Sequence, residues 1–198
     1  MLAIFLDTEA SGLDPFFHRL LEIAFKIVDV STGVEKFSYQ AIIKQPLEIW
    51  EQRDLKSIEI NGFTWEKCET GKEEAVIRQE IIDIFTQYKI TRGTAVYICQ
   101  NPAFDRSFFS QLIDVYTQEK QNWPYHWLDF ASMYWALRIK SYQDQDADFP
   151  LEINVSKNAI AQNYQLPLES IPHSALQGVK HLLLCYQKVV GFKKRGDV

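Results

Sequence analysis

Two acidic residues, two positions apart, follow an apolar stretch at the start of this chain. Residues 2–6 have the β-branched and aromatic content of a strand buried on both faces, and Asp7 and Glu9 come directly after it. Side chains two positions apart on a strand point to the same side, so these carboxylates would lie together. Buried carboxylates repel each other, and a proton or a divalent cation must compensate them. A polar turn that merely contains two acids is the alternative.

A third acid follows a second apolar stretch. Residues 95–99 predict another buried strand, and Asp105 comes after the segment 101–104 at the start of a helix. The positive end of a helix dipole also favours an acid there, so Asp105 alone does not indicate chemistry. Beside Asp7 and Glu9 it would supply a carboxylate from a different element, with metal ions between strand and helix.

A histidine stands just before the last predicted helix. An imidazole titrates near neutral pH, which suits a general base that takes a proton from an attacking water. His173 is followed by Ser174 and Ala175, and then by a helical pattern of apolar residues. A histidine that only satisfies polar groups beside a helix start is the more common alternative.

In combination, these segments resemble the motifs of the DEDDh-type 3′→5′ exonucleases, a superfamily that includes proofreading exonucleases, ribonuclease T and oligoribonuclease. Residues 7–15 (DTEASGLDP) match the first motif, residues 101–105 the second, and His173 with Ala175 the third. The resemblance extends from residue 2 to about residue 190. It implies a ribonuclease-H-like α/β fold, with a mixed central sheet of about five strands and helices on both sides.

The resemblance also implies a role for each matching residue in a reaction that uses two ions, Mg²⁺ or Mn²⁺. Asp7 would bridge both ions, Glu9 would ligate the ion that carries the attacking water, and Asp105 would hold the second ion. His173 would be the general base. The substrate would be the 3′ end of a single strand. Both DNA and RNA stay open, because no motif here reports on contacts to a 2′-hydroxyl.

Three further positions are implied to contact the substrate. Ala10 and Leu13 would meet the last nucleotide, with Leu13 wedged between the terminal bases. Phe104 would pack on the sugar or the base. The family often has a threonine at the position of Ala10, so here only the backbone N–H of that residue would remain as a contact.

The fourth carboxylate of the family is missing. Its position is Gly178, and no other acid lies in the first two turns of the last helix. Loss of this ligand weakens the ion that activates water. The loss fits decayed activity, a site repaired by water or substrate phosphate, or a laboratory substitution. A catalytically impaired protein that binds nucleic-acid ends, or acts as a scaffold, is therefore the alternative function, and a phosphohydrolase of nucleotides or dinucleotides is a third.

Glu22 interrupts the apolar pattern of the second predicted strand. Residues 19–30 and 35–44 predict two strands joined by a hairpin at 31–33, which would form a meander with residues 2–6. We expect Glu22 to face solvent. Residues 73–88 predict an amphipathic helix that packs on the sheet.

Length and composition predict one domain over residues 1–190, followed by a short basic tail at 191–198. Of the 198 residues, 46% are hydrophobic, which is typical of a compact domain. The three cysteines form no CxxC pair, so a cytoplasmic protein is expected. The net charge of −5 argues against broad binding of long duplexes and leaves a few nucleotides at a strand end as the substrate. No membrane partner is expected, whereas a homodimer and a polymerase-type partner both stay open.

Overall fold

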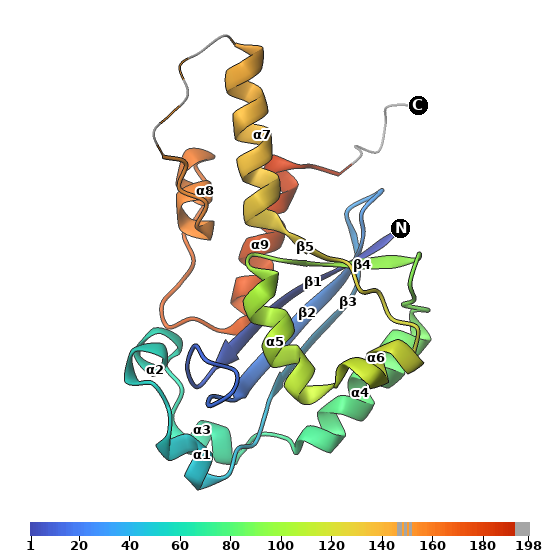
Figure 1. Ribbon diagram of the computed structural model, residues 1–198, viewed down its shortest axis with the longest axis vertical. Coiled ribbons are helices and arrows are strands. Elements are labelled where there is room, and N and C mark those ends of the chain that lie inside the picture. The colour runs from blue at the N-terminus through green and yellow to red at the C-terminus, as the bar shows by residue number, and fades with distance from the viewer. Residues whose placement is uncertain (146–147, 149, 151, 193–198) are drawn as a thin grey trace.

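Five strands form one mixed sheet in the order β3-β2-β1-β4-β5 (Figure 1). The structure is a computed structural model that describes residues 1–145, 148, 150 and 152–192. β1 pairs antiparallel with β2, and β2 pairs antiparallel with β3, whereas β4 runs parallel to β1 and β5 parallel to β4. The strands are β1 (Leu2–Ala10), β2 (Leu20–Asp29), β3 (Val34–Ile42), β4 (Ala95–Cys99) and β5 (Trp127–Asp129). The predicted meander and the mixed five-stranded sheet are confirmed.

β1 is longer than the predicted strand at residues 2–6. It continues as far as Ala10, because β2 is long enough to pair with the acidic segment as well, with Asp7 opposite Ala24 and Glu9 opposite Glu22. The register shifts between Glu9 and Ala10, where the strand ends. The two acids therefore lie on the central strand itself and not in a loop after it.

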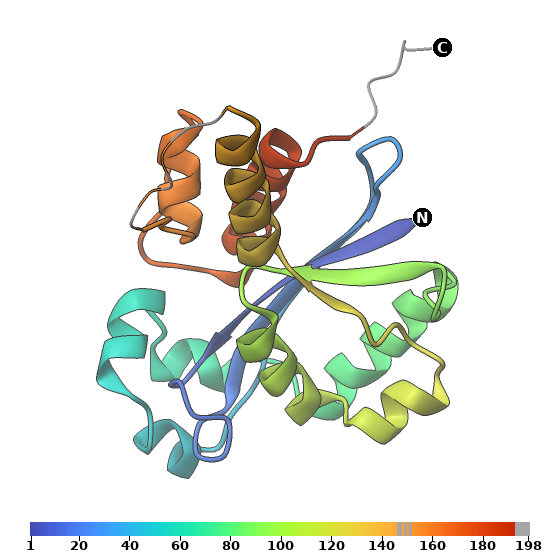
Figure 2. The same ribbon diagram turned by 45° about the horizontal axis from the view of Figure 1, so that its top comes forward.

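Helices cover both faces of the sheet, as predicted (Figure 2). Helices α4 to α6 lie on one face, α7 to α9 lie on the other, and the short helices α1 to α3 lie beyond the carboxyl end of β1 (Figure 1). The helices are α1 (Leu47–Glu51), α2 (Leu55–Asn61), α3 (Trp65–Glu69), α4 (Glu74–Gln87), α5 (Pro102–Leu112), α6 (Val115–Lys120), α7 (Phe130–Asp144), α8 (Lys157–Asn163) and α9 (Ala175–Val189).

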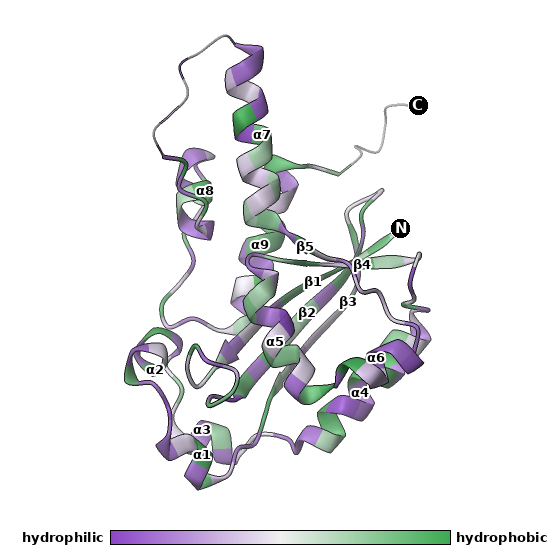
Figure 3. Ribbon diagram, in the orientation of Figure 1, coloured by the Kyte–Doolittle hydropathy of each residue, from purple (hydrophilic) through white to green (hydrophobic). Residues whose placement is uncertain are grey.

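The apolar part of β1 contributes to a separate core on each face of the sheet. Ile4 and Leu6 pack into the core under α4 and α5, whereas Ala3 and Phe5 pack into the core under α7 and α9. This is why the strand shows a continuous apolar run instead of an alternating pattern. Figure 3 shows the change along β1, which becomes hydrophilic at its carboxyl end.

Two further sequence predictions concern the helix at 73–88 and the basic tail at 191–198. The predicted amphipathic helix at 73–88 is confirmed as α4. The basic tail at 191–198 lies, from residue 193 onward, outside the described residues. No helix in the described part of the chain is long and apolar enough to cross a bilayer.

We expect Phe85→Ala to destabilise the fold strongly. Phe85 on α4 is 1% exposed, and its ring contacts those of Trp123 and Phe25 at centroid distances of 4.7 and 5.4 Å. Truncating such a side chain should lower the free energy of unfolding by about 3–5 kcal/mol in urea titrations. Val76→Ala on the exposed face of the same helix is the control, and its effect should stay within about 0.5 kcal/mol. Equal effects of the two substitutions would contradict this packing.

Candidate active site

Three acidic side chains from two elements come together at the carboxyl end of β1. Asp7 and Glu9 lie on the same side of the strand, and Asp105 lies in the first turn of α5. Asp105 is 4% exposed, and its Oδ1 accepts a hydrogen bond of 2.9 Å from Thr8 Oγ1. β1 and β4 are parallel neighbours, so the helix that follows β4 begins beside the end of β1. The topology thus brings together acids that are far apart in the sequence.

Burial makes these carboxylates difficult to ionise. It raises the pKa of Asp7 to about 6, with a further increase from Glu169 that Lys157 opposes. Burial and the charge of Asp7 raise the pKa of Glu9 to about 8. For the same two reasons the pKa of Asp105 lies well above its usual range. Burial therefore disfavours the ionised form of all three carboxylates, and a cation bound among them would favour that form.

Lys157 lies among these acids and was not predicted to be part of the site. Its Nζ is 3.4 Å from Asp7 Oδ1 and 2.8 Å from Glu169 Oε1, and its side chain is 14% exposed. Burial lowers the pKa of Lys157, but the carboxylates of Asp7 and Glu169 outweigh that effect and raise it overall. The sequence offers one hint, because a lysine at the first residue of a helix is disfavoured by the helix dipole.

Glu169 brings a carboxylate close to the position of the missing family acid. A Cβ built on Gly178 would lie 2.0 Å from Asp7 Oδ2 and 3.1 Å from Glu169 Oε1. Glu169 lies in the segment between α8 and α9, and its backbone N–H donates to Asn158 Oδ1 at 2.9 Å. Glu169 approaches from the segment before the last helix, so the acids of that helix alone gave no indication of it. Asp7 uses the space that a side chain at position 178 would need.

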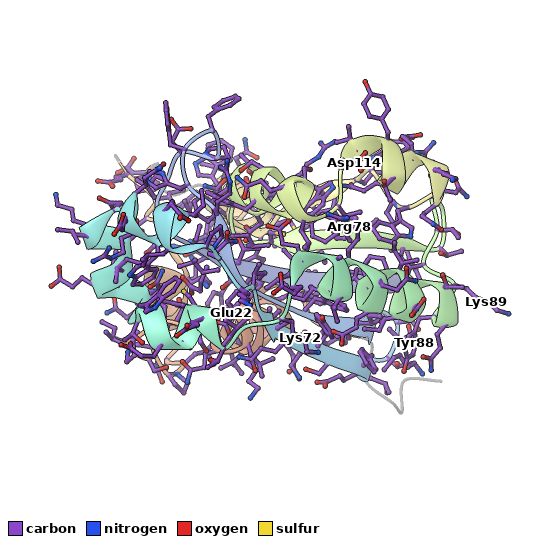
Figure 4. All side chains as sticks on the ribbon, turned by 90° about the horizontal axis from the view of Figure 1, so that it is seen from below. Glu22, Lys72, Arg78, Tyr88, Lys89 and Asp114 are labelled. Carbon is purple, nitrogen blue, oxygen red and sulfur yellow. The ribbon has the colours of Figure 1, made fainter. Side chains whose placement is uncertain are left out.

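The prediction that Glu22 faces solvent is wrong. Glu22 is 1% exposed and is labelled within the body of the molecule in Figure 4, whereas Lys89 extends from its edge. Its Oε1 accepts a hydrogen bond from Gln40 Nε2 at 2.5 Å, and its Oε2 accepts one from the backbone N–H of Ala175 at 3.2 Å. Glu22 thus ties β2 to the start of α9, and its charge also raises the pKa of Glu9.

The segment that carries His173 is held against α2. The backbone N–H of His173 donates to the carbonyl of Ile60 at 2.9 Å, and Asn61 Nδ2 donates to the carbonyl of Ala10 at 3.1 Å. Helix α2 therefore connects the end of β1 to the start of α9. His173 is one of the groups that lower the pKa of Asp7, so its imidazole lies within electrostatic range of the acids.

The three predicted substrate contacts differ in their exposure. Leu13 is 74% exposed at the tip of the loop after β1, whereas Ala10 is buried at the end of the strand. Phe104 is partly buried, with its ring 4.8 Å from that of Phe108. The loop is braced by α5, because Gln111 Nε2 donates to the carbonyls of Pro15 and His18 at 2.7 and 2.9 Å. All three roles stay predictions.

The donors of the site suit one divalent cation. Carboxylate oxygens are the ligands that Mg²⁺ and Mn²⁺ prefer, and Asp7, Glu9 and Asp105 supply three carboxylates from the end of β1 and the start of α5. Within the described residues, however, no three His, Cys, Asp or Glu side chains are already spaced to hold a metal ion. Binding would require these acids to turn toward a common point, and Lys157 already contacts one oxygen of Asp7.

We expect Glu9→Gln to stabilise the chain at high pH in the presence of a chelator. The pKa of Glu9 is raised from 4.5 to about 8 in the folded chain, so the parent loses stability as the pH rises between these values. Glutamine does not ionise. The melting temperature of the Glu9→Gln protein should therefore exceed that of the parent by roughly 5 °C or more at about pH 9, and by much less at about pH 5. Glu48→Gln, at an exposed position on α1, is the control. A difference for Glu9→Gln that does not change with pH would contradict this assignment.

Comparison with known proteins identifies relatives through structure and not through sequence. No family model matches the chain, and no curated protein matches it. A full-length 3′-exonuclease superposes with a TM-score of 0.69 at 13% identity, covering 96% of this chain and 60% of that one. E. coli Exonuclease I in complex with a dT13 oligonucleotide superposes with a TM-score of 0.73 at 15% identity, covering 95% of this chain and 41% of that one.

A third match is a nuclease domain alone. The nuclease domain of 3′hExo, a DEDDh family member bound to rAMP, superposes with a TM-score of 0.68 at 13% identity, covering all of this chain and 97% of that one. The chain thus spans nearly the whole length of that domain and about 60% or less of the two longer proteins. These superpositions confirm the resemblance at the level of the fold: the chain has the ribonuclease-H-like fold of the DEDDh-type 3′-exonuclease domains.

Proposed function

We propose that the chain is a metal-dependent 3′→5′ exonuclease that hydrolyses the terminal phosphodiester of single-stranded nucleic acid. The observation that carries this proposal is the placement of three carboxylates, the partly buried Asp7 and Glu9 and the buried Asp105, at the carboxyl end of β1, with His173 in electrostatic range. The fold supports it, because the superposed domains are those of 3′-exonucleases.

Each residue of the site has a distinct task in this proposal. Asp7, Glu9 and Asp105 hold Mg²⁺ or Mn²⁺, which, when bound, polarises the phosphate and lowers the pKa of water. His173 takes the proton of the attacking water.

The loop after β1 would receive the end of the strand. It exposes three large apolar side chains, those of Leu13, Phe16 and Phe17. Apolar and aromatic side chains of this kind stack on bases without requiring a particular sequence. Single strands are the proposed substrate because the superposed proteins include one bound to an oligonucleotide and one bound to a mononucleotide. Both DNA and RNA should be tested.

We expect the parent chain to shorten a 5′-labelled single strand stepwise and to release mononucleotides from a 3′-labelled one when Mg²⁺ or Mn²⁺ is present. Asp105→Asn and His173→Ala should each lower the rate by about 100-fold or more, because they remove a metal ligand and the general base. The measurement is a time course on DNA and RNA strands resolved by length.

Matched controls separate these effects from loss of folding. Asp83→Asn on the exposed face of α4 and His126→Ala in an exposed loop make the same chemical changes away from the site. Both should cut at the parent rate. A parent chain that binds a labelled strand in Mg²⁺ without cutting it would contradict the exonuclease and favour the end-binding alternative.

We also expect Gly178→Ala to lower the rate, by about 10- to 100-fold, since the new Cβ would lie 2.0 Å from Asp7 Oδ2 and displace this carboxylate. In a helix interior the same substitution would ordinarily be stabilising. Gln187→Ala, on the exposed side of α9, should leave the rate unchanged. A Gly178→Ala protein that cuts as fast as the parent would contradict the proposed role of Asp7.

A further inference from the structure

The Lys157 ammonium lies between two carboxylates of the site, those of Asp7 and Glu169. It contacts Asp7 and Glu169 directly, and its charge also lowers the pKa of Glu9 and Asp105. Its side chain is 14% exposed, and that of Glu169 is 4% exposed. A partly buried cation between two carboxylates of the site has a position that a metal ion could take to balance the same charges.

The contacts of Asp7 show how the position of Lys157 affects the binding of divalent ions. In the two-ion arrangement that the resemblance implies, Asp7 bridges both cations. Here one of its oxygens contacts Lys157 Nζ at 3.4 Å, and the other faces Gly178. A second divalent ion on the oxygen that contacts Lys157 would lie beside a fixed positive charge, which opposes its binding.

The space at Gly178 and the ion pair of Lys157 lie in the same part of the site. Without a side chain at position 178, Asp7 turns toward α9, and Glu169 Oε1 approaches the same space. Glu169 then holds Lys157 Nζ at 2.8 Å. The hydrogen bond from the Glu169 backbone N–H to Asn158 Oδ1 fixes Glu169 to α8, the helix that carries Lys157. The ion pair is therefore built into the fold by residues on both of its sides.

We propose that the ammonium of Lys157 takes the place of one of the two divalent cations, so that this chain binds a single such ion, on Asp7, Glu9 and Asp105. The proposal deepens the proposed function and depends on it. Lys157 acts as a positioning residue, because its ammonium holds the carboxylate of Asp7 and is itself held by the carboxylate of Glu169.

The test counts the Mn²⁺ ions bound per chain by electron paramagnetic resonance of free Mn²⁺. The parent should bind one ion. Lys157→Gln should bind two, because Asp7 and Glu169 are then free to ligate the second. Lys157→Arg keeps the charge and should bind one. Lys188→Gln, at an exposed position on α9, removes a positive charge elsewhere and should also bind one.

Glu169→Gln in the Lys157→Gln background should return the count to one, since the second ion loses a ligand. Any count other than one in the parent, or an unchanged count in Lys157→Gln, overturns the proposal. A parent count other than one overturns the proposal even if a variant does not fold.

The strand-cutting assay on the same samples distinguishes the two proposals. A parent that binds one ion and cuts no strand contradicts the exonuclease while the role of Lys157 stands. A parent that binds two ions and cuts contradicts the role of Lys157 alone.

Discussion

Buried negative charge at the carboxyl end of β1 is the constraint on which the rest of this structure depends. Three carboxylates from β1 and α5 are held where water cannot solvate them well, and burial raises the pKa of each. Such a cluster is stable only when cations or protons compensate it. The ammonium of Lys157 supplies one positive charge, and we propose that a divalent ion supplies the rest.

The surrounding elements hold this costly arrangement in place. β1 pairs with β4 over residues 2–5 and with β2 along its length, so Asp7 and Glu9 extend a central strand that is anchored on both sides at its start. Glu22 ties β2 to the start of α9, and α2 connects Ala10 to the segment of His173. Each of these links uses a buried polar group that is hydrogen-bonded, which is the condition for burying it without a large loss of stability.

The sequence was sufficient for the mixed sheet and for helices on both of its faces, because apolar periodicity and motif spacing report on local structure and chain order, whereas the joint role of Asp7, Glu9 and Asp105 stays a prediction. It was insufficient for Glu22, whose partners Gln40 and Ala175 come from other elements, and for Lys157 and Glu169. These two residues reach Asp7 from the α8 region through tertiary packing, which no local pattern encodes. The carboxylate that approaches Gly178 is that of Glu169, which lies in the segment before the last helix and not within that helix.

A crystal structure with Mn²⁺ and a 3′-terminal mononucleotide would test the central claim most directly, because the anomalous signal of manganese locates each ion. The account predicts one anomalous peak contacted by Asp7, Glu9 and Asp105, with Lys157 Nζ still against Asp7 and Glu169. Two peaks bridged by Asp7, with the Lys157 side chain turned away, would contradict it. A bound nucleotide with no peak near these acids would contradict the metal-dependent nuclease as well.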